Sequence, residues 1–333
     1  MTNQSQPVSN GFWKEKRVFV TGATGMIGSW LVKDLVGARA FVVALVQDAD
    51  PQSELYRSGD IRYVTVVNGG LEDFWTVERA INKHEIDTIF HLGAQTIVGT
   101  AHRFPLPTFE ANIRGTYNLL EASRIHDRLV RRIVVASSDK AYGEQPNLPY
   151  REDMPLAGRH PYEVSKSCAD LIAQCYHQTF RVPVAIARCG NVYGGGDLNW
   201  SRIVPGTIRA LLRRERPVIR SNGHFVRDYV YVKDVARAYR TVAERLECPG
   251  VPGEAFNFSS ETPLTVLELV RAIRNVMGCN DVEPVILDSV QGEIREQRLS
   301  AEKAGRVLEW KCQFDLNRGL GETVAWYNGF LAG

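Results

Sequence analysis

The sequence predicts an α/β fold built on a doubly wound parallel sheet. Short runs rich in β-branched residues alternate with helical stretches through the first half of the 333-residue chain, and this alternation is typical of parallel strands joined by right-handed helical crossovers. The strand runs are apolar at successive positions, as expected for strands buried on both faces. After Gly190 the alternation loosens. The pattern therefore favours a Rossmann-type sheet followed by a smaller mixed α/β C-terminal domain.

The elements of the first half follow one another in regular order. The β-branched and apolar runs predict strands at Arg17–Val20, Ala40–Val46, Tyr63–Val67, Thr88–Leu92, Ile133–Ala136 and Val184–Ala187. Between them the sequence predicts helices at Met26–Val36, Thr76–Lys83, Thr108–His126 and Tyr162–Phe180.

The second half begins with the turn-rich run GNVYGGGDLNW, and shorter elements follow. We expect helices at Val204–Arg214, Val235–Arg245 and Val266–Met277, and a strand at Pro217–Ile219. We therefore predict a cofactor domain over residues 12–190. The remainder, residues 191–333, is predicted to bind a substrate and to close over a cleft, with some of its segments packing back on the first domain.

The composition excludes several classes of function. No apolar run approaches the roughly 20 residues of a membrane helix, and the polar start lacks a secretion signal. Six cysteines without paired or metal-type spacing predict reduced thiols in a cytoplasm. The seven histidines form no ligand cluster, so we expect no metal. A net charge of +2 argues against a nucleic-acid partner, although basic residues gather at Arg209–Arg216.

A glycine-rich loop follows the first predicted strand. VFVTGATGMIGSWLV places Gly22, Gly25 and Gly28 between that strand and a helix. Glycine lets the chain turn sharply and lets a pyrophosphate approach the amides of the helix N-terminus. An ordinary strand–helix turn can show the same spacing, but the place of the loop in a strand–helix–strand unit favours a dinucleotide. The candidate residues of the loop are Gly22, Thr24, Gly25, Met26, Ile27 and Gly28.

A carboxylate lies where a dinucleotide ribose is usually bound. Asp48 comes twenty residues after Gly28, just past the second predicted strand, and could accept hydrogen bonds from a ribose diol. It could equally be a solvated turn residue, because Asp50 and Pro51 follow it. No arginine pair lies nearby to bind an additional phosphate, so NAD is favoured over NADP.

Tyr162 and Lys166 form the centre of the predicted chemistry. They are four residues apart in a helical stretch, so both side chains share one face. A lysine ammonium near the phenol favours the phenolate, and lowering a tyrosine pKa from about 10 to about 7 takes roughly 4 kcal/mol. Ser138, at a strand end, could hold a substrate hydroxyl for Tyr162. The alternative is an ordinary amphipathic helix.

Asp139 and Lys140 follow Ser138 directly and add a second acid/base pair. An enzyme that only oxidises an alcohol needs only the first set. The second pair suggests that a ketone is made in order to be used in further chemistry.

Several motifs in fixed order carry a resemblance to a known family. TGATGMIGSWL, HLGAQ, the Ser138 region, YEVSK and RCGNVYGGG resemble the extended short-chain dehydrogenase/reductase superfamily, whose members rearrange nucleotide sugars on bound NAD. The match covers nearly the whole chain. Within it, SSDKAYG, GNVYGGGD and FVRDYVYVKD look most like the CDP-glucose 4,6-dehydratases, which have Asp-Lys where related dehydratases have Asp-Glu.

The resemblance implies a reaction in three steps. Tyr162, assisted by Ser138, takes the 4-hydroxyl proton while hydride leaves carbon 4. The ketone acidifies the hydrogen on carbon 5, and Asp139 protonates the departing 6-hydroxyl. Hydride then returns to carbon 6. Lys140 is the base at carbon 5 or an electrostatic stabiliser of the enolate; a structural ion pair is the alternative.

The resemblance also implies the binding residues. Leu92 and Ala94 would border NAD together with Tyr162 and Lys166, and Gln95 would face the sugar. The diphosphate needs amide or guanidinium donors, and the candidates are Asn191, Arg202, Arg227 and Arg295. Arg227 could instead form a local ion pair with Asp228. Relatives usually have Gly-Asp after the third strand, where the aspartate contacts adenine, but this chain has Gly69-Gly70.

Two other functions remain open at this stage. An NAD-dependent 4-epimerase would use Tyr162 and Lys166 and release no water. A catalytically silent NAD-binding regulator would bind the cofactor without turnover. The resemblance further implies a homodimer formed through the helices predicted at Thr108–His126 and Tyr162–Phe180.

Overall fold

The computed structural model describes residues 11–289 and 294–332. Its centre is a seven-stranded sheet in which all neighbouring strands are parallel, in the order β10-β6-β5-β4-β1-β2-β3. The predicted Rossmann-type fold is confirmed. The strands are β1 (Arg17–Thr21), β2 (Phe41–Val46), β3 (Val64–Asn68), β4 (Thr88–His91), β5 (Arg132–Ser138), β6 (Val184–Cys189) and β10 (Ala255–Phe258).

Helices cover both faces of this sheet, which explains why its strands are apolar at successive positions. On β1, Val18 and Val20 pack toward one face, while Phe19 packs toward the other. The first face is covered by α1 (Met26–Gly37), α9 (Val232–Glu244) and α11 (Glu302–Leu308). The second is covered by α3 (Phe74–Lys83), α6 (Gly115–Ile125) and α7 (Pro161–Phe180).

The helix predicted at Thr108–His126 is divided in the structure. After α4 (Val98–Arg103), a short α5 (Pro105–Phe109) runs into a π-helical turn, η2 (Glu110–Arg114), and only then into α6. The turn contains Asn112, which is buried and whose side-chain amide bonds both backbone groups of Gln95. Such π turns are frequent near functional sites, and this one holds the segment that follows β4.

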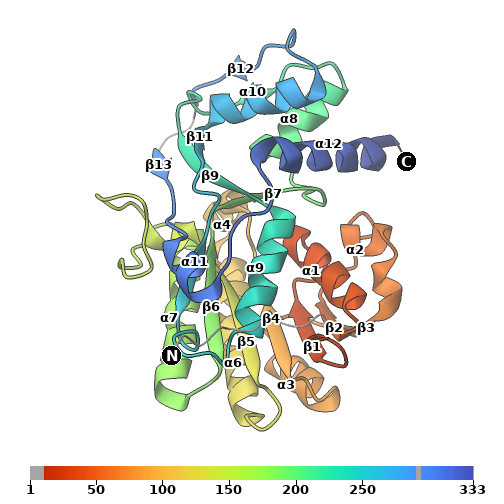
Figure 1. The fold of residues 1–333 in the computed structure, drawn as a ribbon, viewed down its shortest axis with the longest axis vertical. Coiled ribbons are helices and arrows are strands. Elements are labelled where there is room, and N and C mark those ends of the chain that lie inside the picture. The colour runs from red at the N-terminus through yellow and green to blue at the C-terminus, as the bar shows by residue number, and fades with distance from the viewer. Residues whose placement is uncertain (1–10, 290–293, 333) are drawn as a thin grey trace, which may run out of the picture.

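Most of the elements after residue 190 gather at one end of the molecule, beyond the sheet (Figure 1). The central strand of this group, β9, pairs with three short strands, and three helices surround them. The strands are β7 (Asn191–Tyr193), β9 (Val226–Tyr231), β11 (Pro263–Thr265) and β13 (Glu296–Gln297), with a separate pair β8 (Val218–Ile219) and β12 (Val285–Ile286). The helices are α8 (Ile203–Leu212), α10 (Val266–Met277) and α12 (Leu316–Ala332).

Three elements after residue 190 belong with the large sheet: β10, α9 and α11. Strand β10 pairs with β6 at the edge of the large sheet, and α9 packs against α1. The division of the chain into residues 12–190 and 191–333 therefore stays a prediction. Three short elements complete the described chain: α2 (Glu54–Arg57), η1 (Asp60–Tyr63) and η3 (Asp139–Tyr142). Among the described residues, no helix is both long and apolar enough to cross a membrane.

Candidate active site

A cavity of about 1070 Å³ opens where the parallel strands end at their carboxyl edge. This is the usual ligand site of doubly wound sheets. Most of the residues predicted from the sequence line it: Gly22, Thr24, Gly25, Met26, Ile27, Gly28, Leu92, Ala94, Ser138, Asp139, Lys140, Tyr162, Lys166, Asn191, Arg202 and Arg227. Three predicted residues do not line it, namely Asp48, Gln95 and Arg295.

The N-terminus of α1 forms one wall and fits the diphosphate of a dinucleotide. Gly22 has a φ of 68°, and a Cβ added there would lie 2.7 Å from the amide nitrogen of Gly93. A Cβ on Gly28 would collide with the carbonyl oxygen of Gly22. Gly25, the N-cap, offers no side chain to the first-turn amides, and no acidic residue lies in that turn. The bare amides and the helix dipole therefore favour an anion.

The remaining cofactor predictions concern two positions, one just after β2 and one just after β3. Asp48 lies just past β2 and is exposed, so its contact with a ribose stays a prediction. After β3, Gly70 stands where the resemblance implies an aspartate, and it has no side chain. The carboxylate of Glu72 occupies the space that a Cβ on Gly70 would fill. Glu72 therefore supplies an acidic group at this point, although the sequence alone did not indicate it.

Helix α7 brings Tyr162 and Lys166 into the cavity. The helix starts with Pro161, whose fixed φ suits a first helical position. The carboxylate of Glu163 accepts hydrogen bonds from the backbone amides that precede it. The Lys166 Nζ donates to the carbonyl oxygen of Ala136, 2.9 Å away at the end of β5. Burial lowers the pKa of Lys166 to about 8.

The environment of Tyr162 differs from the expectation. Burial raises the pKa of this phenol to about 12, and the positive charge of Arg202 opposes the rise only in part. The prediction that Lys166, helped by the positive nicotinamide ring, favours the phenolate stays a prediction. The Lys166 amine donates to a backbone carbonyl, and burial disfavours its charged form.

The second acid/base pair lies on η3, next to Ser138. The Ser138 hydroxyl donates to Asp139 Oδ1 at 2.9 Å and accepts from the Lys140 amide at 3.2 Å. The Lys140 Nζ lies 3.5 Å from Asp139 Oδ2 and also donates to the side-chain oxygen of Gln297 on β13. Gln297 is buried. Sequence reasoning did not find it, because it lies 157 residues from Lys140 outside any recognised motif.

Three of the predicted substrate residues line the cavity from the part of the chain after residue 190. Asn191 has a buried Nδ2 with no hydrogen-bond partner among the described residues. Arg202 pairs with Asp197, with Nη1 3.2 Å from Oδ2. Arg227 donates from Nη1 to the carbonyl oxygens of Val226 and Arg295, at 2.8 and 3.2 Å.

The alternative of an Arg227–Asp228 ion pair is wrong. Asp228 is fully buried and points away, accepting a hydrogen bond from the amide of Leu299 at 2.6 Å. Burial raises the pKa of Asp228 to about 6.

Two other substrate candidates stay apart from the cavity. Gln95 Oε1 accepts from the amide of Ile97 at 3.1 Å, and the neighbouring Thr96 lines the cavity in its place. Arg295 is exposed, and its carbonyl oxygen supports Arg227. Two residues of the basic cluster noted in the sequence, Arg209 and Arg216, line the cavity. Arg220, which follows the cluster, lines it as well.

Comparisons with known proteins agree with this geometry. The model of the "NAD dependent epimerase/dehydratase family" matches residues 18–258. A CDP-glucose 4,6-dehydratase from Salmonella typhimurium (strain LT2) is 31% identical over 98% of this chain and 94% of its own length.

Two solved structures share the fold. A UDP-glucose 4-epimerase from Thermotoga maritima has a TM-score of 0.86 at 27% identity, covering 95% of this chain and 99% of its own. A dTDP-glucose 4,6-dehydratase from Streptomyces venezuelae, with NAD bound, has a TM-score of 0.84 at 27% identity, covering 94% and 97%. With its glycine-rich cradle and the Tyr162–Lys166 helix, the chain belongs to the NAD-dependent epimerase/dehydratase family of the extended short-chain dehydrogenase/reductase superfamily.

Proposed function

We propose that the protein is a nucleotide-sugar 4,6-dehydratase that converts CDP-glucose to CDP-4-keto-6-deoxyglucose. One observation carries the proposal. Asp139 and Lys140 lie in the same cavity as Ser138 and Tyr162, so a second acid/base pair can reach the sugar that the first pair oxidises. The Asp-Lys sequence and the likeness to a CDP-glucose 4,6-dehydratase support the CDP-glucose assignment.

The first set of residues prepares the oxidation at carbon 4. Ser138 orients the 4-hydroxyl, and Tyr162 accepts its proton. NAD held by the glycine loop at the N-terminus of α1 would supply the hydride acceptor for carbon 4 and the hydride donor for carbon 6, and its positive ring would favour the Tyr162 phenolate. This charge is needed because burial holds the pKa of Tyr162 near 12. Lys166, anchored on Ala136, adds a second positive group while it is protonated.

The second set performs the elimination. The ketone at carbon 4 makes the carbon 5 hydrogen acidic, and Lys140 takes that proton or stabilises the enolate. Asp139 gives its proton to the departing 6-hydroxyl, and water leaves; a proton returns to carbon 5 when carbon 6 receives the hydride. The side-chain oxygen of Gln297 holds the Lys140 amine in place. The diphosphate is bound by Asn191, Arg202 and Arg227, which line the same cavity.

A 4-epimerase is the second candidate, because a UDP-glucose 4-epimerase shares the fold over nearly the whole chain. It would use Tyr162 and Lys166 and leave Asp139 and Lys140 without a chemical role. The test is a panel of CDP-, dTDP-, GDP- and UDP-hexoses incubated with the protein and NAD and measured by mass spectrometry. A dehydratase product has lost one water, whereas an epimer keeps its mass. Loss of water from CDP-glucose is the expected result.

We also propose that the protein works as a homodimer in the cytoplasm. Large apolar side chains are exposed on α6 and α7, within the helices that the resemblance assigns to the dimer, and on the preceding α5; they are Leu106, Tyr117, Ile125, Leu171 and Phe180. In a dimer these side chains would be buried between the two copies and removed from contact with water. The cytoplasmic location is supported by the six cysteines, all of which are free thiols.

A further inference from the structure

The two acid/base pairs lie on different elements of the chain. Tyr162 and Lys166 belong to α7, whereas Asp139 and Lys140 belong to η3 at the end of β5. Two steps on one bound sugar require that the pairs keep a fixed separation, since displacements of about 1 Å cost roughly 100-fold in rate. A single turn of 3₁₀-helix has few internal hydrogen bonds to hold it. Contacts from outside the turn must therefore fix its position.

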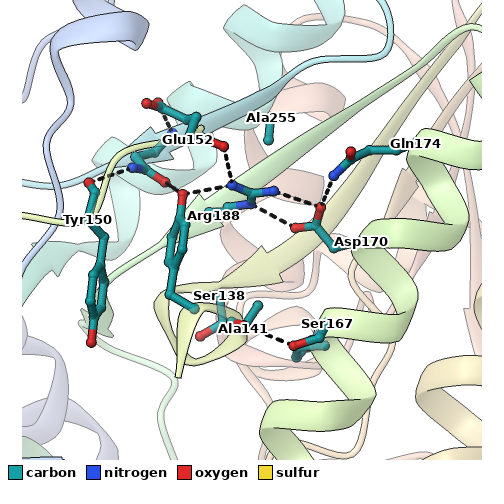
Figure 2. A network of polar contacts seen from close by, with 12 residues as sticks. Ser138, Ala141, Tyr150, Glu152, Ser167, Asp170, Gln174, Arg188 and Ala255 are labelled. Carbon is teal, nitrogen blue, oxygen red and sulfur yellow. Dashed lines mark hydrogen bonds and ion pairs between the residues drawn. The ribbon is translucent and has the colours of Figure 1, made fainter. Parts of the chain in front are cut away.

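Ser167 makes such a contact. It follows Lys166 on α7 and is buried. Its hydroxyl has one proton to donate and lies 2.9 Å from the carbonyl oxygen of Ala141, the residue that follows Lys140. It also lies 3.0 Å from the carbonyl oxygen of Glu163, one helical turn earlier. Figure 2 shows Ser167 facing Ala141 across the gap between helix and turn.

A second connection leaves the same helix one turn later. Asp170 holds Arg188 of β6 through two hydrogen bonds, 2.8 and 2.9 Å long (Figure 2). Arg188 in turn donates from Nη1 to the hydroxyl of Tyr142, the last residue of η3, at 2.8 Å. The far end of the turn is thus tied to α7 through a buried guanidinium.

Tyr142 is itself tightly enclosed. Its ring is fully buried and stacks on Tyr150, with centroids 5.0 Å apart. Its hydroxyl donates to Asn257 Oδ1 at 2.8 Å, and the Asn257 amide donates to the carbonyl oxygen of Tyr150 at 3.0 Å. The side chain of Tyr142 therefore has little freedom and fixes the far end of the turn, while Ser167 bonds the turn directly at Ala141, the residue next to Lys140.

We infer that Ser167 is a positioning residue that holds the elimination pair, Asp139 and Lys140, in register with the oxidation pair, Tyr162 and Lys166. This inference rests on the proposed dehydratase function. Ser167 is absent from the residues that line the cavity, so it acts through the turn. Removing its hydroxyl leaves Ala141 paired, because the Ala157 amide donates to the same carbonyl oxygen at 3.1 Å. The variant should therefore fold.

The test compares Ser167→Ala with Ser123→Ala. Ser123 on α6 is also buried and also bonds the carbonyl four residues earlier, at 2.7 Å to Leu119, but the contacts of its hydroxyl stay within its own helix. Each variant is mixed rapidly with NAD and with the nucleotide sugar that the wild-type protein dehydrates. Absorbance of the reduced cofactor follows oxidation, and mass spectrometry follows water loss.

For Ser167→Ala we expect oxidation within about twofold of wild type and water loss roughly 10- to 100-fold slower, so that reduced cofactor accumulates. Ser123→Ala should behave like wild type in both steps. Equal slowing of both steps in Ser167→Ala, or no slowing of water loss, would overturn the inference.

A second measurement needs no substrate. Hydrogen exchange in η3, where the Gly143 amide donates to the Lys140 carbonyl at 3.1 Å, should become about fivefold faster or more in Ser167→Ala, and stay unchanged in Ser123→Ala. Unchanged exchange in Ser167→Ala also overturns the inference. If the wild-type protein removes water from no nucleotide sugar, the proposed function fails, and hydrogen exchange still decides whether Ser167 holds the turn.

Discussion

Asp170 and Arg188 form a bidentate ion pair inside the protein, with Nε 2.8 Å from Oδ2 and Nη2 2.9 Å from Oδ1. The two side chains are 0% and 2% exposed. Asp170 lies on α7 and Arg188 on β6, so the pair fastens the helix that bears Tyr162 to the central sheet. Gln174 donates a further hydrogen bond to Asp170 at 2.8 Å.

The first prediction concerns this pair. Asp170→Asn should lower the free energy of unfolding by about 3–5 kcal/mol, because it leaves the Arg188 guanidinium buried without its counter-charge. Urea denaturation measures the effect. Glu302→Gln is the matched control, since the Arg151–Glu302 pair is 54% and 66% exposed; its loss should cost about 1 kcal/mol or less. If both variants lose a similar amount of unfolding free energy, burial does not make the Asp170–Arg188 pair contribute more than an exposed pair.

The second prediction uses the lowered pKa of Lys166. In the unfolded chain this lysine titrates near its ordinary value of 10.5, and in the folded protein near 8. Between these values the unfolded state binds one proton more than the folded state, so the free energy of unfolding gains a contribution that grows with pH. From pH 8 to about pH 10.5 wild type should therefore gain roughly 3 kcal/mol of stability relative to Lys166→Met.

Urea denaturation of wild type and Lys166→Met across this pH range measures the difference between their free energies of unfolding. Titrating groups that both proteins share contribute equally and cancel in this difference. Lys83→Met, which removes an exposed lysine on α3, is the control and should follow the wild-type pH dependence. A constant difference between wild type and Lys166→Met would contradict the lowered pKa.

The sheet and the cofactor loop were predictable from the sequence because their signals are local. Each of the first six sheet strands contains an apolar run that is visible in the sequence. The glycines of the cofactor loop, where a side chain would collide with the backbone, are equally visible there. Strand β10 and helix α12 were missed. The first is four residues long, and the second contains Gly319, Gly321 and Gly329, which disfavour a helix. Gly319 is nevertheless required, since a Cβ there would strike the hydroxyl of Tyr193.

The polar partners of the site were less predictable, because they depend on contacts distant in sequence. Tyr162, Lys166 and Ser138 lie in motifs, and the structure brings them together. Gln297, which holds Lys140, comes from a two-residue strand that local propensity does not mark. The effect of burial on the pKa of Tyr162 was not predictable either, because helical spacing gives the distance to Lys166 and says nothing of burial.

The third prediction separates the two steps of the proposed reaction. Asp139→Asn removes the proton donor for the departing hydroxyl, and Lys140→Met removes the base at carbon 5. Each should slow water loss by about 100-fold or more while oxidation at carbon 4 continues. Rapid mixing with CDP-glucose, followed by cofactor absorbance and product mass, measures both steps.

An isotope label on the sugar provides an independent check on this prediction. Deuterium placed on carbon 4 should appear on carbon 6 of the wild-type product. Water loss at the wild-type rate in Lys140→Met would leave that lysine only a structural role, through contacts such as its ion pair with Asp139.

The fourth prediction concerns Asp48. Asp48→Ala should weaken NAD binding by about 10-fold, the equivalent of one or two lost hydrogen bonds to a ribose diol, and should leave NADP binding unchanged. Titration calorimetry on the protein without substrate measures both affinities. Asp50→Ala is the control, because Asp50 is also exposed and its carboxylate bonds only the amide of Gln52 among the described residues. If NAD binds Asp48→Ala as tightly as wild type, Asp48 is a surface turn residue.

The fifth prediction tests the homodimer. Leu106 on α5 and Leu171 on α7 are 66% and 53% exposed, and α5 packs directly against α7. Two such leucines on adjoining helices form an apolar face that a second copy can cover. Leu171→Glu places a charge in that face, and burying an unpaired carboxylate costs several kcal/mol, so the variant should be monomeric at concentrations where wild type is dimeric.

Light scattering after size-exclusion chromatography measures the mass. Trp75→Gln is the control: Trp75 is 72% exposed but lies on α3, so the dimer should persist. Because each copy contains a complete cavity from its own residues, the Leu171→Glu monomer should still bind NAD. A dimer that survives Leu171→Glu would place the contact between copies on another face of the protein.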